Sequence, residues 1–553
     1  MSIVIAARGA SRTRLAVYTL AACVAGIGLF LVCIGLRRSL WFDEAWVANS
    51  ATSTSLYEVF YYPHWLQTSP PLFLLVVRAS AAAFGLTTLS LRMVPLVMGV
   101  VSAALMAVVA RRLWSIAYGL LAWVTFVLSP ATIVFSANLK QYSSELAAAS
   151  AILLAALMYR QHPNSRRFCL LLAAVSIGLL ASYPLVFALP GITLFVTLVP
   201  VPSRAAPSVS SKSASLLRGL ILGVINASIF GVEYIFLIAP NTSPALYSFW
   251  IPRPGVAIAI LSACGRLLKL LPLNGPLPST IEPVPLTAGL ITRALVIAVI
   301  ALTGFVLAFL RFLKGRRKWI EIQVLCLSPC LVAVVAHAAS WYPASPRTSL
   351  FLLPFLVTFL TSSVQLMATF LISRFRQPWL RPSVRAALFI LTIATIAVGI
   401  NNVPVSQLKA PTEDVESAVS FLRSHVRRDD LLWVHASMSE SFALYKRILG
   451  WSDPPAVYGH TGSPCCPRGV VSARSVGSEE SIRRDIDDAL PVGRSGKIWL
   501  LYTGHWAWVG QDEAVIAKRI LRQKGCSESD AQSFYNVGLA VFDCLVSRGD
   551  IRR

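Results

Sequence analysis

The chain has 553 residues, of which 56% are hydrophobic and only 13% are charged, and its mean hydropathy is +0.66. Soluble globular proteins carry about 25% charged residues, so this composition excludes a polar soluble enzyme. The 31 glycines and 33 prolines are ordinary for the length and exclude a collagen-like or disordered chain.

Charged residues are distributed unevenly along the chain. Residues 1–404 contain 30 basic and 7 acidic side chains, whereas residues 405–553 contain 19 basic and 18 acidic ones. Most of the basic residues in the first part flank apolar segments. The net charge of +24 therefore indicates membrane topology rather than nucleic-acid binding. We predict a transmembrane domain over 1–404 and a soluble extracytoplasmic domain over 405–553.

Eleven segments are apolar enough to be predicted as spanning helices, which need about 20 mostly apolar residues. They are residues 15–36, 91–110, 115–133, 143–159, 168–183, 185–201, 216–239, 286–310, 320–340, 348–373 and 386–403. The fifth and sixth are short and meet at Pro184, where proline disfavours a continuous helix. We predict two hinged helices there, with one long buried apolar segment as the alternative.

The basic residues predict the orientation of this bundle. Arg8, Arg12 and Arg14 precede the first span, which places the N-terminus in the cytoplasm. Alternating the spans then puts 20 of the 30 basic residues on that side, and residues 37–90 and 241–285 become long outer loops. A cleaved signal peptide is the alternative for residues 1–36, but no small-residue cleavage site precedes Arg37.

The tail is predicted to be a small α/β domain with a mixed or parallel sheet. Helical spacing is found at 413–426, 440–448 and 513–523, and strands are predicted at 431–434, 497–502 and 537–544. Cys526 and Cys544 flank the last strand region, so a disulfide between them is expected in an oxidising compartment.

The first motif with chemical potential is Asp43-Glu44, set among aromatic residues just outside the first span. Acidic groups near a bilayer are costly, and partial burial raises the pKa of a carboxylate toward the range useful for a general base. The bland alternative is a solvated pair that marks the outer face. After this pair, Pro70-Pro71 predicts a helix start, with residues 72–84 lying along the membrane surface.

Two further motifs could bind an anionic group. Lys140 and Tyr142 lie at the outer end of the fourth span, and Arg347 enters the tenth span from the outer side. Lysine and arginine can bind phosphate, although both also serve as plain interfacial anchors. Weaker candidates for positive charge in outer segments are Arg92, Arg253, Arg266 and Lys269.

These motifs together resemble the GT-C superfamily of membrane glycosyltransferases. The likeness is greatest to bacterial members related to protein O-mannosyltransferases and lipid A aminoarabinose transferases. It covers about residues 15–400 and is carried by Asp43-Glu44, Pro70-Pro71-Leu72, Ser90-Leu91-Arg92, Lys140–Ser143 and Arg347. Ser69 and Lys140 depart from the family's usual basic residue before Pro-Pro and its usual arginine.

The resemblance implies an α-helical multi-pass membrane fold and a polyprenyl-phosphate-linked sugar donor, with a lipid, glycan or protein acceptor. Transfer would take place at the outer face of the plasma (inner) membrane and would invert the configuration of the anomeric carbon of the sugar. Asp43 would be the general base, and Lys140, Tyr142 and Arg347 would bind the donor phosphate. Glu44 would orient Asp43, bind the acceptor or hold a divalent cation, and no other cofactor is expected.

Three alternatives remain for the function. A lipid-linked sugar transporter or flippase would show internal repeats and polar residues at mid-membrane. An O-antigen ligase or polymerase would lack the early Asp-Glu pair. A non-catalytic scaffold would keep its function without Asp43.

Overall fold

The structure is a computed structural model, and it describes residues 2–62, 68–201, 209–242, 256–272, 288–375, 377, 379–409, 412–435, 438–452, 456–458, 479–489, 496–503 and 513–544. The chain forms two compact units. The membrane unit comprises Met1–Gly35, Pro95–Phe236 and Trp250–Val405. The tail unit comprises Leu36–Val94, Leu237–Phe249 and Ser406–Arg553. Residues 36–94, which we assigned to the membrane domain, are grouped with residues 406–553 in the second unit.

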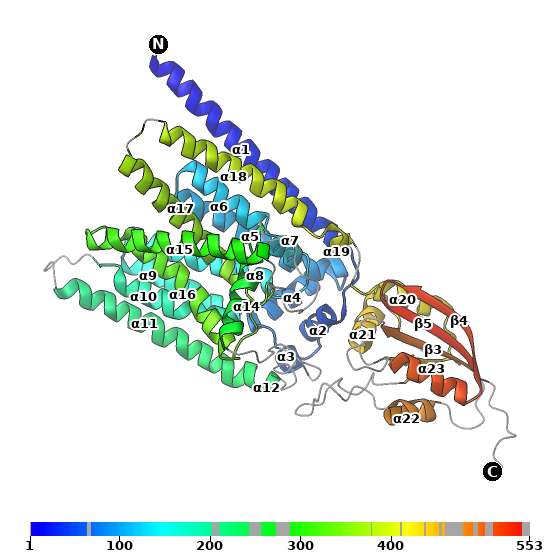
Figure 1. Cartoon of the computed structure of the whole chain (residues 1–553). Helices are drawn as coiled ribbons and strands as arrows, with labels where there is room; N and C mark the ends of the chain where they lie inside the picture. The colour runs from blue at the N-terminus through cyan, green and yellow to red at the C-terminus, as the bar shows by residue number, and fades with distance from the viewer. Residues whose placement is uncertain are drawn as a thin grey trace. The chain divides into compact units, whose positions relative to one another are not determined.

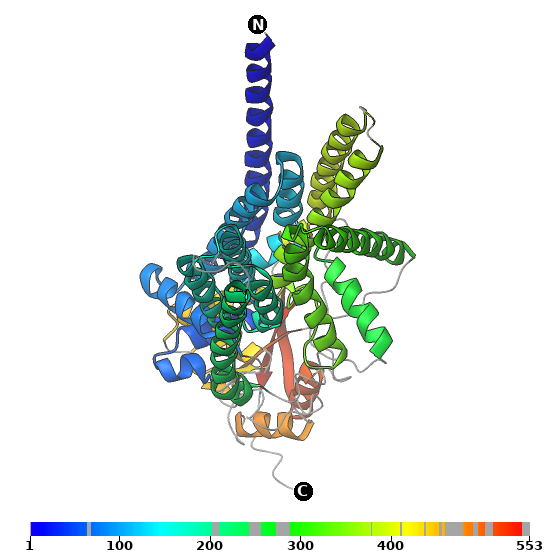
Figure 2. The ribbon, with the colours of Figure 1, turned by 90° about the vertical axis from the view of Figure 1, so that its left-hand side faces the viewer.

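The membrane unit is built of helices (Figures 1 and 2). In chain order they are α1 (Ser2–Gly35), the main part of α5 (Thr88–Leu113), α6 (Ile116–Val127), α7 (Pro130–Ser136), α8 (Tyr142–Gln161), α9 (Ser165–Ala181), η1 (Tyr183–Ala188), α10 (Leu189–Leu198), α11 (Val209–Glu233), α14 (Val256–Leu268), α15 (Ala288–Leu313), α16 (Lys318–Ala338), η4 (Leu350–Leu352), α17 (Leu353–Phe375) and α18 (Leu380–Asn402). Within the described residues, eight helices are long and apolar enough to cross a membrane, or nine if the bent pair α6–α7 forms one span. The chain is thus a multi-pass membrane protein.

The predicted spans 168–183 and 185–201 correspond to α9 and the η1–α10 pair, and each is shorter than 18 residues. The break lies at Ser182, whose extended backbone (φ −162°) ends α9 just before Pro184. Proline fixes its own φ and restricts the residue before it, so a long helix cannot pass this point.

The helices of the membrane unit pack through small residues. Gly191 of α10 lies against Ser328 of α16, and Gly304 of α15 lies against Ser363 of α17, so closely that a Cβ on either glycine would collide. Large apolar side chains such as Leu302 and Ile390 remain exposed on the outside. This division is typical of membrane helices, where small residues allow close approach and apolar residues face lipid.

The tail unit begins with short helices and ends in an α/β domain. Its elements are α2 (Phe42–Ala51), α3 (Leu56–Phe60), α4 (Pro71–Phe84), α12 (Ala239–Asn241), α19 (Val405–Lys409, with Val405 at the boundary), α20 (Val415–His425), β1 (Leu431–Val434), α21 (Ser439–Ile448), β2 (Ala456–Tyr458), α22 (Glu479–Ala489), β3 (Gly496–Thr503), α23 (Glu513–Gln523), β4 (Cys526–Phe534) and β5 (Val537–Cys544). The helix predicted after Pro71 is present as α4. All six predicted tail elements are also present, whereas β2, β4 and α22 were not predicted.

The sheet has strand order β2-β1-β3-β5-β4 and is mixed, as predicted. The first three strands are parallel, and β5 pairs antiparallel with both β3 and β4. Figure 1 shows α20 and α21 on one side of the sheet and α22 and α23 on the other. A disulfide joins Cys526 and Cys544, directly opposite each other on β4 and β5, as the cysteine positions led us to expect.

Candidate functional site

Asp43 and Glu44 lie in the first turn of α2, where the helix dipole favours negative charge. The backbone N–H of Glu44 donates to the Trp41 carbonyl at 2.9 Å, and the Glu44 carboxylate accepts from the Trp41 N–H at 3.4 Å. Neighbouring residues on a helix point in different directions. The two carboxylates consequently differ, because Glu44 is fully buried and Asp43 is half-buried.

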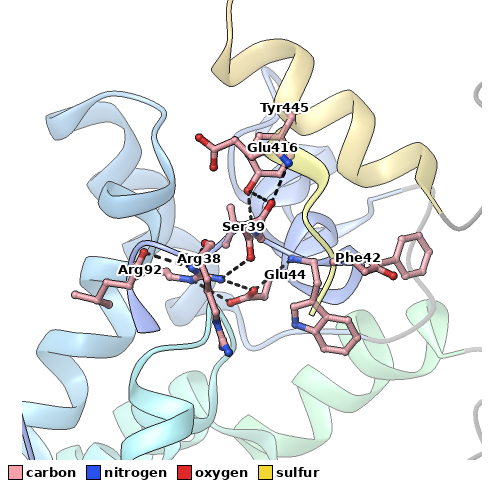
Figure 3. A network of polar contacts seen from close by, with 11 residues as sticks. Arg38, Ser39, Phe42, Glu44, Arg92, Glu416 and Tyr445 are labelled. Atoms are coloured by element: carbon pink, nitrogen blue, oxygen red, sulfur yellow. Dashed lines mark hydrogen bonds and ion pairs between the residues drawn. The ribbon is translucent and has the colours of Figure 1, made fainter. Parts of the chain in front are cut away.

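Glu44 is held by Arg92, which comes from the start of α5 and is also fully buried. Arg92 Nη2 lies 2.7 Å from Glu44 Oε2, and its Nε lies 3.3 Å from Glu44 Oε1, so the pair is bidentate. The remaining N–H groups donate to the backbone carbonyls of the preceding loop, namely Leu36, Arg38 and Ser39. All five guanidinium donors are thus used within the protein (Figure 3).

Arg92 thus joins Glu44 to the backbone of the loop before α2. Within the described part of the chain, no three His, Cys, Asp or Glu side chains are placed to bind a metal ion. Asp43 is the more exposed carboxylate of the pair.

Arg38 adds positive charge beside this pair. It is buried, and burial lowers the pKa of its guanidinium to about 10. The Glu44 carboxylate opposes this shift in pKa, and the Arg92 charge adds to it.

The Ser90-Leu91-Arg92 motif lies in the first turns of α5. Ser90 and Thr87 cap each other, with the Thr87 N–H on Ser90 Oγ at 3.1 Å and the Ser90 N–H on Thr87 Oγ1 at 3.0 Å. Gly85, with φ +80°, makes the turn between α4 and α5. The motif thus fixes where Arg92 projects.

The segment around Lys140 lies in the membrane unit, between α7 and α8. Lys140, Tyr142 and Glu145 are all buried, and the Tyr142 ring packs edge-on against Phe135 at 5.1 Å. Burying a lysine, a carboxylate and a phenol so close together in the chain costs free energy. Ionisable residues at such positions in membrane proteins usually have a function.

The loop that carries Arg347 is held from several helices of the same unit. His337 at the end of α16 accepts from the Ala344 N–H at 3.1 Å, and Arg266 of α14 donates to the Ala344 carbonyl at 3.1 Å. Tyr342 donates to the Thr348 carbonyl and closes the loop. Arg347 itself is half-buried.

The Lys140 segment and the Arg347 loop lie together. Burial first, and then the negative charge of Glu145, raises the pKa of Tyr342 well above its ordinary value, and Tyr142 adds to this effect. In addition, η4, which directly follows the Arg347 loop, packs against α8. The structure thus brings together two motifs that are about 200 residues apart in the sequence.

Several buried polar atoms gather in this part of the membrane unit without a hydrogen-bond partner among the described residues. They are Asn138 Oδ1, Gln141 Oε1, Glu145 Oε2, Arg266 Nε and Ser349 Oγ. Native interiors satisfy the great majority of such groups, so a cluster of exceptions is typical of a site that takes a polar ligand or water.

The other basic candidates fall into two groups. Arg266 is buried beside the Arg347 loop, and burial lowers its pKa. Lys269 is half-buried, and burial and then the nearby charge of Arg293 lower its pKa. Arg253 lies outside the described residues. Sequence reasoning missed His337, and in the tail unit it missed Glu440 and Tyr445, because no local pattern marks these residues.

Comparison with known proteins places this geometry in a wider context. The family model described as dolichyl-phosphate-mannose-protein mannosyltransferase matches residues 68–229, which include Pro70-Pro71, Arg92 and Lys140. None of the curated proteins compared with the sequence matches it significantly.

Solved structures resemble the fold over nearly its full length. ArnT from Cupriavidus metallidurans bound to undecaprenyl phosphate has a TM-score of 0.55 and 13% identity, covering 95% of this chain and 97% of that one. The same protein in the apo state has a TM-score of 0.51 and 13% identity, covering 96% and 98%. The expected resemblance to the GT-C superfamily of membrane glycosyltransferases is confirmed by the family model and this shared fold.

Proposed function

We propose that the chain is an inverting glycosyltransferase that moves a sugar from a polyprenyl-phosphate-linked donor to an acceptor hydroxyl at the outer face of the plasma (inner) membrane. The observation that carries the proposal is the gathering, around the Lys140 segment and the Arg347 loop, of buried cations and of polar atoms that have no hydrogen-bond partner among the described residues. The GT-C fold supports it, and so does the undecaprenyl phosphate held by the structurally similar ArnT.

The donor phosphate is assigned to Lys140 and Arg347, with Tyr142 lining the same region. A buried or half-buried cation attracts an anion more strongly than one in water, because the local dielectric constant is lower. Arginine adds planar bidentate hydrogen bonding, and lysine adds a compact point charge. Arg266 contributes positive charge beside the Arg347 loop, where it donates to the Ala344 carbonyl.

The reaction follows from these roles. The acceptor oxygen attacks C1 of the sugar as the bond from C1 to the phosphate oxygen breaks, through an oxocarbenium-like transition state. The bonding electron pair leaves with the polyprenyl phosphate, whose growing negative charge Lys140 and Arg347 stabilise. The acceptor proton passes to the Asp43 carboxylate. Attack opposite the leaving group inverts the anomeric carbon.

Asp43 is the base in this scheme, and Glu44 is its neighbour with a structural duty. A general base must reach the acceptor proton, whereas the Glu44 carboxylate is fully buried with Arg92 on both its oxygens. Asp43 is half-buried in the first turn of the same helix.

The orientation is proposed from the basic residues. The N-terminus is cytoplasmic and the tail is extracytoplasmic, since short loops rich in arginine and lysine stay inside. Counting or omitting α9 and η1–α10 as spans changes the number of crossings by two, so every other loop keeps its side of the membrane.

The test is sugar transfer from radiolabelled polyprenyl-phosphate sugars by the full chain in proteoliposomes. The wild type is compared with Asp43→Asn and with Glu480→Gln, a matched change at an exposed tail carboxylate. We expect transfer by the wild type and the control, and a loss of about 10²–10⁴-fold in Asp43→Asn. Equal transfer by Asp43→Asn would rule out Asp43 as the base, and no transfer by the wild type from any such donor would refute the proposed activity.

A further inference from the structure

The helix that carries Asp43 is held at both ends by the α/β domain of the tail unit. Helix α2 packs against α21, and α21 packs against α20. Figure 3 shows Tyr445 and Glu416, from α21 and α20, meeting the segment that leads into α2. Residues more than 350 positions apart in the sequence therefore build one structure.

At the amino end of α2, the hydroxyl of Tyr445 is the central contact. It accepts the Leu40 N–H at 2.5 Å and the Ser39 hydroxyl at 3.1 Å, and it hydrogen-bonds to the Glu416 carboxylate. The Glu416 backbone N–H returns to Ser39 Oγ at 3.0 Å. Tyr445 is fully buried, and burial raises its pKa to about 12, so the hydroxyl keeps its proton at neutral pH.

A second contact reaches the residue next to Asp43. The Phe42 N–H is one of the amides that has no partner within the helix. It donates to Glu413 Oε2 at 3.4 Å, and Glu413 Oε1 accepts from the Thr503 hydroxyl at the end of β3, at 3.2 Å. Glu413 is fully buried, so the first turn of α2 is tied to the sheet through this carboxylate.

At the carboxyl end of α2, Glu440 is the anchor. Its Oε2 accepts from the Asn49 amide at 2.8 Å and from the Tyr62 hydroxyl at 2.6 Å, and its backbone carbonyl accepts from Asn49 at 2.9 Å. Arg447, about two turns further along α21, donates to the Thr52 carbonyl and hydroxyl at 2.9 Å. The helix is thus fixed at its first and its last turn.

We propose that the tail domain positions the catalytic base, and that Tyr445 and Glu440 are the positioning residues that set where Asp43 stands. This inference rests on the proposed function, because it concerns the base of that reaction. A shift of about 1 Å in a reacting group can lower a rate about 100-fold. A helix of ten residues pinned at both ends cannot make such a shift without breaking these buried hydrogen bonds.

The experiment compares Tyr445→Phe and Glu440→Gln with Tyr535→Phe, which changes an exposed tyrosine of the same domain. Hydrogen exchange of the α2 amides is measured first, together with the thermal unfolding midpoint of the full chain. We expect the α2 amides to exchange at least about 10-fold faster in both positioning variants and unchanged in the control. Unchanged exchange in both variants would show that the Tyr445 and Glu440 contacts do not hold α2 in place, whatever the activity of the protein.

The second measurement is kcat and KM, in the wild-type and Asp43→Asn backgrounds. We expect Tyr445→Phe to lower kcat about 10-fold with the donor KM unchanged, and to lower the residual rate of Asp43→Asn by less than about 2-fold. Such non-additivity is expected only if Tyr445 acts through Asp43. Equal losses in the two backgrounds would refute positioning of the base. An inactive wild type would refute the proposed function. The exchange data would still decide whether the Tyr445 and Glu440 contacts hold α2 in place.

Discussion

The Glu44–Arg92 pair and the Lys140 segment differ in how completely their buried polar groups are paired. In the tail unit, Arg92 uses all five of its donors, and both oxygens of Glu44 are occupied. Around the Lys140 segment in the membrane unit, polar atoms such as Glu145 Oε2 and Arg266 Nε have no hydrogen-bond partner among the described residues. A closed network builds a rigid frame, whereas an open one is suited to a ligand.

The largest expected effect comes from removing Arg92 from its buried pair with Glu44. Arg92→Ala leaves the Glu44 carboxylate buried without its partner, and removing one member of a buried pair costs about 3–5 kcal/mol. We expect a large fall in the thermal unfolding midpoint and in the yield of folded protein. Arg111→Ala, at an exposed arginine of the same helix, serves as the control. A midpoint equal to the wild type's would show that the pair does not support the fold.

The next effect addresses the open region. Lys140→Gln and Arg347→Gln each remove a proposed charge-assisted hydrogen bond to the donor phosphate, worth about 1.5–3 kcal/mol. We expect affinity for a polyprenyl phosphate to fall about 10- to 150-fold, while the unfolding midpoint changes little. Binding is measured by titrating the purified protein in nanodiscs. Undiminished affinity in both variants would show that the donor phosphate does not bind at Lys140 and Arg347.

The smallest expected effect is a pH dependence of stability that arises from Glu416. Burial first, and then the charge of Asp414, raises the pKa of Glu416 above its ordinary value, against the opposing effects of Arg92 and Tyr445. Because the folded-state pKa is the higher one, the stabilising contribution is complete below the unfolded pKa of about 4.3 and is lost as pH rises through the folded value. Glu416→Gln should therefore flatten the decline in the unfolding midpoint from about pH 4 upward. A decline as steep as the wild type's would mean that Glu416 is not its source.

Sequence patterns predicted the elements with strong apolar periodicity and failed where that signal is weak. The six tail elements found as predicted each carry a run of buried apolar residues. Strand β4 is missed because it is a polar edge strand with mostly exposed side chains, and α22 is missed because only Ile482 and Ile486 mark its buried face. The break at Ser182 could be predicted from the nearby Pro184, because proline disfavours a continuous helix.

The candidate site shows the same limit. The motifs at Asp43, Lys140 and Arg347 could be predicted, because charged residues stand out in an apolar chain. The different surroundings of Asp43 and Glu44 could not, since Glu44 is buried against Arg92, which lies 48 residues away. The contacts of Tyr445 and Glu440 with α2 join segments about 400 residues apart, and no local pattern encodes them.

The most direct test of the central claim separates the rate of transfer from donor binding. Single-turnover transfer is measured with Asp43→Asn and Lys140→Gln over a range of donor concentrations. The account predicts that Asp43→Asn lowers the rate at saturating donor by at least about 100-fold with donor affinity unchanged, and that Lys140→Gln mainly weakens donor affinity. Transfer by Asp43→Asn at the wild-type rate, or a loss of donor affinity in that variant alone, would contradict it.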